Sequence, residues 1–174
     1  MNEKFLSRGK RKEHDFYGLG GEWVYGIPIQ THIGTFICFE ENPHYCGQYG
    51  YMEIEELSKV IPETIGYCTG LTDKNGKMIF EGDIIKLGGH KFKFIKANGY
   101  EFVVKFGKCG GVQNVDYEVG YIGFYVTPIG KDAKLLLDSG VRTDILYWLN
   151  AYEVYVIGNI HDNPELIGGN ANET

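Results

Sequence analysis

Closely spaced turn signals divide this chain into short apolar segments, and that spacing limits the folds available to it. The clearest signal is Asp73-Lys74-Asn75-Gly76, between the strand-like segments 64–69 and 77–80. Asn-Gly supplies the positive φ angles that a tight hairpin turn requires. A second turn signal, Glu81-Gly82-Asp83, directly precedes the apolar segment 84–87. We therefore predict an antiparallel hairpin followed by a sharp bend into another strand.

The same pattern of short segments continues along most of the chain. Further strands are expected at 22–27, 33–39, 91–96, 100–106, 120–127 and 152–160, where aromatic and β-branched residues gather between turn residues. A helix is expected at 52–60, although 51–54 could equally be a strand, and a brief helix at 143–149. Segment 40–50 is expected to be a loop, and 163–166 a turn or one helical turn.

These expectations predict a mainly β fold, because no long helices lie between the strands to make parallel crossovers. By analogy with small barrels that place Gly-Asp before an apolar strand, the architecture is expected to be an SH3-like barrel or roll. It would carry additional N-terminal strands and one or two short helices. Residues 1–66 would form an N-terminal β segment packed on the core, residues 67–167 the barrel core, and residues 168–174 a disordered tail.

The charge balance argues mildly against a dedicated nucleic-acid binder, because the formal net charge is −6 and such proteins usually carry a basic surface. A local basic patch could still bind nucleic acid. The residues that would form it are Arg8, Arg11, Lys91, Lys93 and the aromatic Phe92. Alternatively, residues 91–94 are the two faces of one half-buried strand.

Catalytic and metal-binding patterns are weak, so we expect neither an enzyme nor a bound cofactor. His44 and Cys46, with Cys38 or His32, are the nearest approach to a metal site, but no Cys-x-x-Cys pair accompanies them. Cys68 and Cys109 are candidate nucleophiles without a neighbouring His, and are more simply read as small apolar residues. The least favoured hypothesis is an enzyme that uses Glu81 and Asp83. The N-terminus has no signal-peptide core and no segment spans a membrane, so a cytoplasmic location is expected.

Two segments carry a family resemblance: IGYCTGLTDKNGKMIFEGDII at 65–85 and VIGNIHDNPEL at 156–166. With RGKR at 8–11 and EWVYG at 22–26, they resemble the YopX family of phage and prophage proteins. The resemblance implies an SH3-type barrel core in the cytoplasm of a bacterial host cell. Segment 108–142 matches no motif of the family.

The motif residues have a structural reading of their own, since their types are those of turns. They are Thr69, Gly70, Asp73, Gly76, Glu81, Gly82, Asp83, Asn159, Asn163 and Pro164. The less favoured reading is a functional polar cluster around Glu81, Asp83, Asn159 and Glu165. The preferred hypothesis is a phage accessory protein that acts, without catalysis, by binding a host or phage protein, with a homo-oligomer possible. The alternative is a small-barrel nucleic-acid-binding protein.

Overall fold

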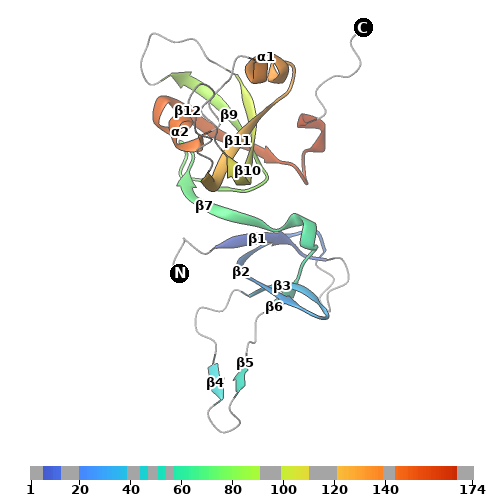
Figure 1. The fold of residues 1–174 in the computed structure, drawn as a ribbon. Helices are drawn as coiled ribbons and strands as arrows, with labels where there is room; N and C mark the ends of the chain where they lie inside the picture. The colour runs from blue at the N-terminus through green and yellow to red at the C-terminus, as the bar shows by residue number, and fades with distance from the viewer. Residues whose placement is uncertain are drawn as a thin grey trace. The chain divides into compact units, whose positions relative to one another are not determined.

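The computed structural model describes residues 6–12, 20–38, 44–46, 51–53, 57–90, 99–109, 121–138 and 144–167. The chain divides into two compact units, residues 1–70 and 71–174. Strands dominate the described residues of both units, and the helices are few and short (Figure 1). The prediction of a mainly β fold is therefore confirmed.

The first unit is built on an antiparallel sheet. Its strands are β1 (Ser7–Lys10), β2 (Trp23–Thr31), β3 (Gly34–Cys38), β6 (Leu57–Lys59) and β7 (Gly66–Thr72), hydrogen-bonded in the order β6-β3-β2-β1-β7. β7 continues through the division between the units. A separate antiparallel pair consists of β4 (His44–Cys46) and β5 (Tyr51–Glu53). A 3-10 turn, η2 (Pro62–Thr64), leads from β6 to β7.

This sheet curls until the end of β6 returns to the end of β1. Arg11 and Val60 form an isolated antiparallel bridge there, and the N–H of Lys12 donates to the carbonyl of Lys59 at 3.0 Å. The curl leaves little room inside. A Cβ on Gly26 would lie 2.0 Å from the carbonyl oxygen of Cys38, so glycine is required at that close approach.

The inner face of the curled sheet accordingly holds small side chains around two aliphatic ones. Ile37 and Val60 are fully buried there, and Gly9 faces Val60 with only 3.2 Å available to a Cβ. The remaining buried residues of this face are Ser7, Gly26, Thr35 and Ser58. Because residues opposite each other in an antiparallel pair share a face, Trp23, Tyr25, Ile27 and Ile29 of β2 and Phe36 of β3 lie on the other side of the sheet from Ile37.

The second unit contains a four-stranded antiparallel sheet and two short helices. After β8 (Met78–Phe80), β9 (Asp83–His90), β10 (Glu101–Cys109), β11 (Tyr121–Ile129) and β12 (Tyr152–Asn159) pair in the order β11-β10-β9-β12. Helices α1 (Ala133–Asp138) and α2 (Ile145–Ala151) precede β12, and a 3-10 turn, η3 (Pro164–Leu166), follows it. In the part of the chain that the structure describes, no helix is long and apolar enough to cross a membrane.

The core of this unit lies between the sheet and α2. Phe102 is fully buried, and its ring centre lies 5.1 Å from that of Trp148, which lies 5.3 Å from that of Tyr152. The other buried core residues are Ile79, Ile85, Leu87, Val104, Val126, Leu136, Ile145 and Val154. These large side chains explain why strands with Phe, Val and Ile on one face fold against a short helix.

Most of the expected strands and the brief helix are confirmed, but the helix at 52–60 is wrong. Its described residues lie in β5 and β6, and β6 pairs with β3. Within β6, Leu57 is exposed and Ser58 buried, which is the two-residue period of a strand. Pairing along β3 therefore outweighed a weak helical pattern. The expected loop at 40–50 is wrong at His44–Cys46, which forms β4.

Three further expectations are not confirmed: the SH3-like barrel, the strand at 91–96 and the tail at 168–174. Among the described strands the sheets are open, with no ladder joining β11 to β12, so the SH3-like barrel is not confirmed. The strand expected at 91–96 and the tail at 168–174 lie outside the described residues.

Candidate functional site

Asp73 joins the hairpin turn to the last strand of the second unit. Its Oδ1 accepts hydrogen bonds from the N–H groups of Asn75 at 2.8 Å and Lys77 at 2.9 Å, and its Oδ2 from that of Val156 at 3.1 Å. The side chain is buried. Gly76 completes the turn with φ of 81°, a conformation that favours glycine. The carboxylate of Asp73 is thus occupied by backbone groups of two elements.

Lys74, next in the turn, forms an ion pair across to β12. Its Nζ contacts Oε1 of Glu153, and its N–H donates to the carbonyl of Val154 at 2.9 Å. The hydrogen bond with Glu153, followed by one with Tyr155, raises the pKa of Lys74 above 10.5. Both partners are substantially exposed, so this pair fixes the position of the turn more than it stabilises the fold.

The turn at Glu81-Gly82-Asp83 is also stabilised by hydrogen bonds of its own buried residues. Oδ2 of Asp83 accepts from the N–H of Phe80 at 2.8 Å, and Asp83 is 1% exposed. Gly82 has φ of 81°, donates its N–H to the carbonyl of Val104 at 2.9 Å and accepts from the N–H of Ile160 at 2.9 Å. This turn therefore contacts β10 and the end of β12.

The same geometry argues against Glu81 and Asp83 as a catalytic pair. Asp83 is too buried to touch a substrate. Oε1 of Glu81 accepts a long hydrogen bond, 3.4 Å, from the N–H of Phe106. A general acid or base must come within hydrogen-bonding reach of the reacting group, and Asp83 cannot do so without opening of the turn.

The C-terminal motif forms a turn of interlocked polar side chains. Nδ2 of Asn159 donates to Oδ2 of Asp162 at 2.7 Å, and Oδ1 of Asn163 accepts from the N–H of Asn159 at 3.3 Å. Nδ2 of Asn163 donates to Oε1 of Glu165 at 3.3 Å, and Pro164 begins η3. The structure brings part of the polar cluster considered from the sequence together, because Asp83 and Asn159 lie opposite each other in the pairing of β9 with β12, and both are buried. Glu165 is linked to Asn159 through Asn163.

The remaining motif residues lie at the end of β7. Thr69 is half-buried and Gly70 has φ of 73°. The buried free thiol of Cys68 accepts the N–H of Gly70 at 3.4 Å. The side chain of Cys109 lies outside the described part of the structure.

No metal-binding group of three or more His, Cys, Asp or Glu occurs among the described residues. His44 and Cys46 lie in β4, but their side chains are not among those described. Cys38 is a buried free thiol in β3, and His32 lies in the exposed turn before it. Of the four residues considered for a metal site, the structure therefore describes the side chains of only Cys38 and His32.

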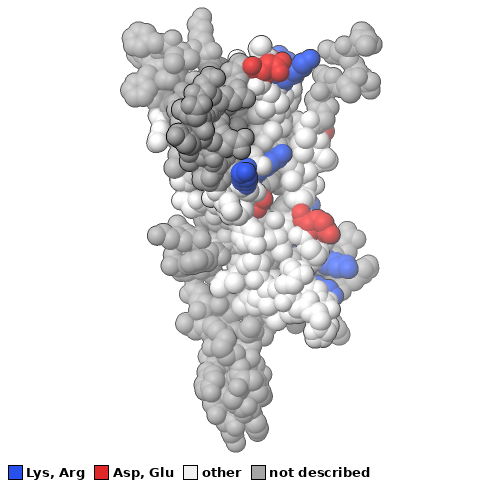
Figure 2. All heavy atoms as spheres, in the orientation of Figure 1, with Lys and Arg blue, Asp and Glu red and all other residues white. Residues whose placement is uncertain are grey.

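The residues expected to bind nucleic acid are only partly described. Arg8 is 5% exposed, with its guanidinium 4.6 Å from the ring centre of Trp23, and Arg11 is half-buried. Residues 91–93, which include Lys91, Phe92 and Lys93, lie outside the described residues. On the face shown in Figure 2, the described Lys and Arg side chains form small separate groups rather than one basic surface.

The feature that sequence reasoning missed is the outer face of the first unit's sheet. Tyr25, Ile27 and Leu57 are 45%, 54% and 42% exposed. The register places Ile27 opposite Cys38, which in turn lies opposite Leu57. We define the outer face as Lys10, Trp23, Tyr25, Ile27, Ile29, Phe36, Leu57 and Lys59, which the pairing of β1, β2, β3 and β6 places on one side. The same pairing places Arg8 and Cys38 on this side, and both are buried.

Cations lie among the aromatic rings of this outer face. Nζ of Lys10 is 5.8 Å from the ring centre of Trp23, and Nζ of Lys59 is 5.9 Å from that of Phe36. These distances are within the range of cation–π attraction. The face therefore combines large apolar side chains with positive charge, whereas the chain as a whole carries −6.

A smaller apolar group lies on β10 and β11 in the second unit. Phe106 and Phe124 are opposite each other with ring centres 5.0 Å apart, and Phe106 is 46% exposed. Ile122, on the same face of β11, is 76% exposed. This group spans two strands, whereas the outer face of the first unit spans four.

Fold and side chains together define a mainly β protein whose polar motif residues hold turns and whose exposed apolar residues form a sheet surface. The sequence profile of the YopX protein family matches residues 24–168, which is most of the chain. The chain therefore belongs to the YopX family. The comparison with curated proteins gives no match.

Proposed function

We propose that this chain is a non-enzymatic interaction module that binds another protein through the outer face of its first unit. The observation that carries the proposal is the outward orientation of the large residues of β2. Trp23, Tyr25, Ile27 and Ile29 share the outer side, while Gly26 lies on the inner side. Trp and Tyr are enriched where protein interfaces are most tightly packed.

The energetics support a binding role for this surface. Fully burying one large apolar side chain contributes about 1.5–3 kcal/mol, and Tyr25, Ile27 and Leu57 are each roughly half exposed. Covering them would therefore contribute about 1 kcal/mol per residue. Contiguous apolar patches of this kind on soluble proteins commonly mark interaction sites.

The finer parts of the proposal follow from the family resemblance. The chain would be an accessory protein of a phage or prophage, located in the cytoplasm of the bacterial host, and its partner a host or phage protein. A homo-oligomer formed through the same face is a second form of the proposal. An SH3-type barrel in the second unit would serve as the scaffold.

The test is capture of partners from a lysate of phage-infected host cells, with and without nuclease treatment. The bait proteins are the parent chain, Ile27→Glu on the outer face, Ile122→Glu in the apolar group of the second unit, and Leu135→Glu as an exposed control on α1. We expect a nuclease-resistant partner that the parent and Leu135→Glu retain and Ile27→Glu loses. Light scattering of the same proteins would show whether that partner is a second copy.

Two results would count against this assignment. Equal retention by the parent and Ile27→Glu would remove the outer face from consideration. Loss on Ile122→Glu in its place would move the interaction to the apolar group of the second unit. Circular dichroism of each variant shows that lost binding is not lost folding.

Nucleic-acid binding is the second candidate function, because cations and aromatic rings share the outer face, as they do on sheets that bind single strands. Two observations make it the weaker candidate. Arg8 is too buried to reach a phosphate, and the most exposed residue of the face is aliphatic Ile27, which cannot stack on a base as a ring does. Fluorescence anisotropy with labelled single- and double-stranded oligonucleotides tests it. Reversing Lys10 and Lys59 to Glu should weaken binding and flatten its salt dependence if the outer face binds, whereas reversing Lys91 and Lys93 to Glu should do so if segment 91–96 binds. Absence of binding at low salt would exclude this function.

A further inference from the structure

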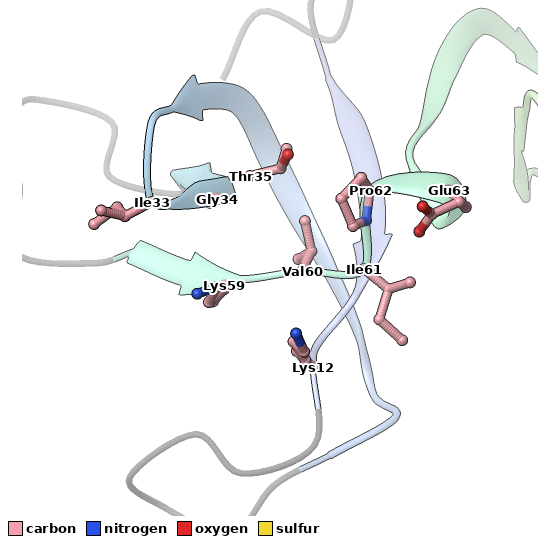
Figure 3. Close-up of a pocket in the computed structure, with 9 residues that line it drawn as sticks. All are labelled: Lys12, Ile33, Gly34, Thr35, Lys59, Val60, Ile61, Pro62 and Glu63. Atoms are coloured by element: carbon pink, nitrogen blue, oxygen red, sulfur yellow. The ribbon is translucent and has the colours of Figure 1, made fainter.

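A hollow of about 350 Å³ lies beside the outer face, where β6 meets the chain that follows β1. Lys12 and Lys59 line it together with the apolar residues Ile33 and Ile61. Figure 3 shows both lysines on one side of β6, while the side chains of Val60 and Thr35 rise on the other. The volume falls in the range of small ligand sites.

The two lysines are brought together by the curl of the sheet. The bridge between Arg11 and Val60 is antiparallel, so the next residues, Lys12 and Lys59, lie directly opposite each other. The N–H of Lys12 donates to the carbonyl of Lys59 at 3.0 Å. Like charges directly opposite in an antiparallel pair repel each other and destabilise it. An anion bound between them would relieve this repulsion.

The aliphatic part of the Lys59 side chain packs over the backbone of Gly34. A Cβ on Gly34 would lie 2.8 Å from Cε of Lys59, so the lysine lies over a residue without a side chain. Its ammonium group is 5.9 Å from the ring centre of Phe36. Neither Lys12 nor Lys59 forms an ion pair with another residue that the structure describes. Glu63 also lines the hollow, so the described lining carries two positive charges and one negative charge and is positive overall.

We propose that this hollow receives a carboxylate side chain from an acidic, apolar segment of the partner protein. The inference rests on the proposed function, since Lys59 belongs both to the hollow and to the outer face. Apolar walls beside the lysines suit a segment in which acidic and apolar residues alternate. Ile33 is 62% exposed and offers a phosphate backbone nothing to bind, so a protein segment fits better than a nucleic acid.

Fluorescence anisotropy with the full chain tests this. The probes are a short labelled peptide in which Glu alternates with Leu and Phe, the same peptide with Lys in place of Glu, and a labelled oligothymidylate. The parent should bind the acidic peptide most tightly. Reversing both lysines, Lys12→Glu with Lys59→Glu, should weaken that binding by about tenfold or more, as expected from the loss and reversal of two surface ion pairs. Lys131→Glu with Lys134→Glu, an equal charge change at two exposed sites of the second unit, should leave affinity within about twofold.

The neutral variant Lys12→Gln with Lys59→Gln guards against a folding defect and should lose a smaller factor, about threefold. Equal binding of the acidic and basic peptides overturns the proposal, as does unchanged affinity in the double variants. Tighter binding of oligothymidylate than of the acidic peptide, weakened by the same variants, would reassign the hollow to nucleic acid. If Ile27→Glu loses the natural partner but the lysine variants keep it, the proposed function stands and this inference fails.

Discussion

Replacing Asp73 by alanine should destabilise the second unit by about 3–5 kcal/mol. The buried carboxylate accepts three backbone N–H groups, from Asn75, Lys77 and Val156. A buried hydrogen-bonding group left without its partner costs about 1–3 kcal/mol. Asn75 and Lys77 are exposed, so water can partly replace the acceptor there. The N–H of half-buried Val156 carries the larger share of the loss.

Asparagine at this position separates the roles of the two oxygens. Asp73→Asn keeps one oxygen for the turn but presents an NH₂ group to the N–H of Val156, so two donors face each other. We expect a cost of about 1.5–3 kcal/mol, between the parent and the alanine variant. Asp138→Asn, an exposed residue of α1, is the matched control and should change stability by less than about 0.5 kcal/mol.

Urea denaturation followed by tryptophan fluorescence measures these differences. The chain has two tryptophans, and a Trp23→Phe background leaves Trp148, in the core of the second unit, as the reporter. The expected order of midpoints is parent, Asp73→Asn, Asp73→Ala, with similar slopes. If Asp73→Ala lies within about 0.5 kcal/mol of the parent, the carboxylate is not a structural residue. The motif around it would then have to be reconsidered as a functional site.

Two further predictions concern glycine placement and pH. Gly26→Ala should destabilise the first unit by about 3 kcal/mol or more, because the new Cβ would overlap the carbonyl of Cys38. Gly89→Ala, where a Cβ would have nothing within 4 Å, is the control and should change stability by less than about 1 kcal/mol. Equal effects of the two substitutions in urea denaturation would contradict the packing described. The raised pKa of Lys74 means that its pairing with Glu153 stabilises the fold below pH 10.5 and is lost as the pH rises through the folded-state pKa. Glu153→Gln should abolish that alkaline dependence in stability-against-pH curves and change little at neutral pH; a large loss at neutral pH would show that the pair matters more than its exposure suggests.

The hairpin at Asp73–Gly76 could be predicted from sequence because its determinants are local. Asn-Gly fixes the turn conformation, and Asp73 binds N–H groups two and four residues further on. The bond from Asp73 to Val156 could not be predicted in this way. This hydrogen bond depends on the position of β12 relative to the turn, which cannot be inferred from the spacing of residues in the sequence. The motif therefore indicated a turn without showing what the turn holds.

The prediction of a helix at 52–60 was wrong because the structure of this segment is determined by residues far away in the sequence. Its helical pattern was weak, and the competing interaction lies far away in the sequence. Ser58 pairs with Ile37 of β3, and both are buried on the inner face. A small polar residue between Leu57 and Lys59 looks unremarkable in a helix. In the sheet it is the residue that fits the narrow interior.

The outer face shows why the candidate site was missed. Alternation along β2 separates Trp23, Tyr25 and Ile27 from Val24 and Gly26, but alternation alone does not say which set is inside. Size would assign the large set to the core. The close approach of Gly26 to the backbone of β3 reverses that assignment, because at that inward position only a residue without a Cβ fits. A sheet in which one strand places its large apolar residues outward in this way gains stability when that surface is covered, which is the physical basis for expecting a partner.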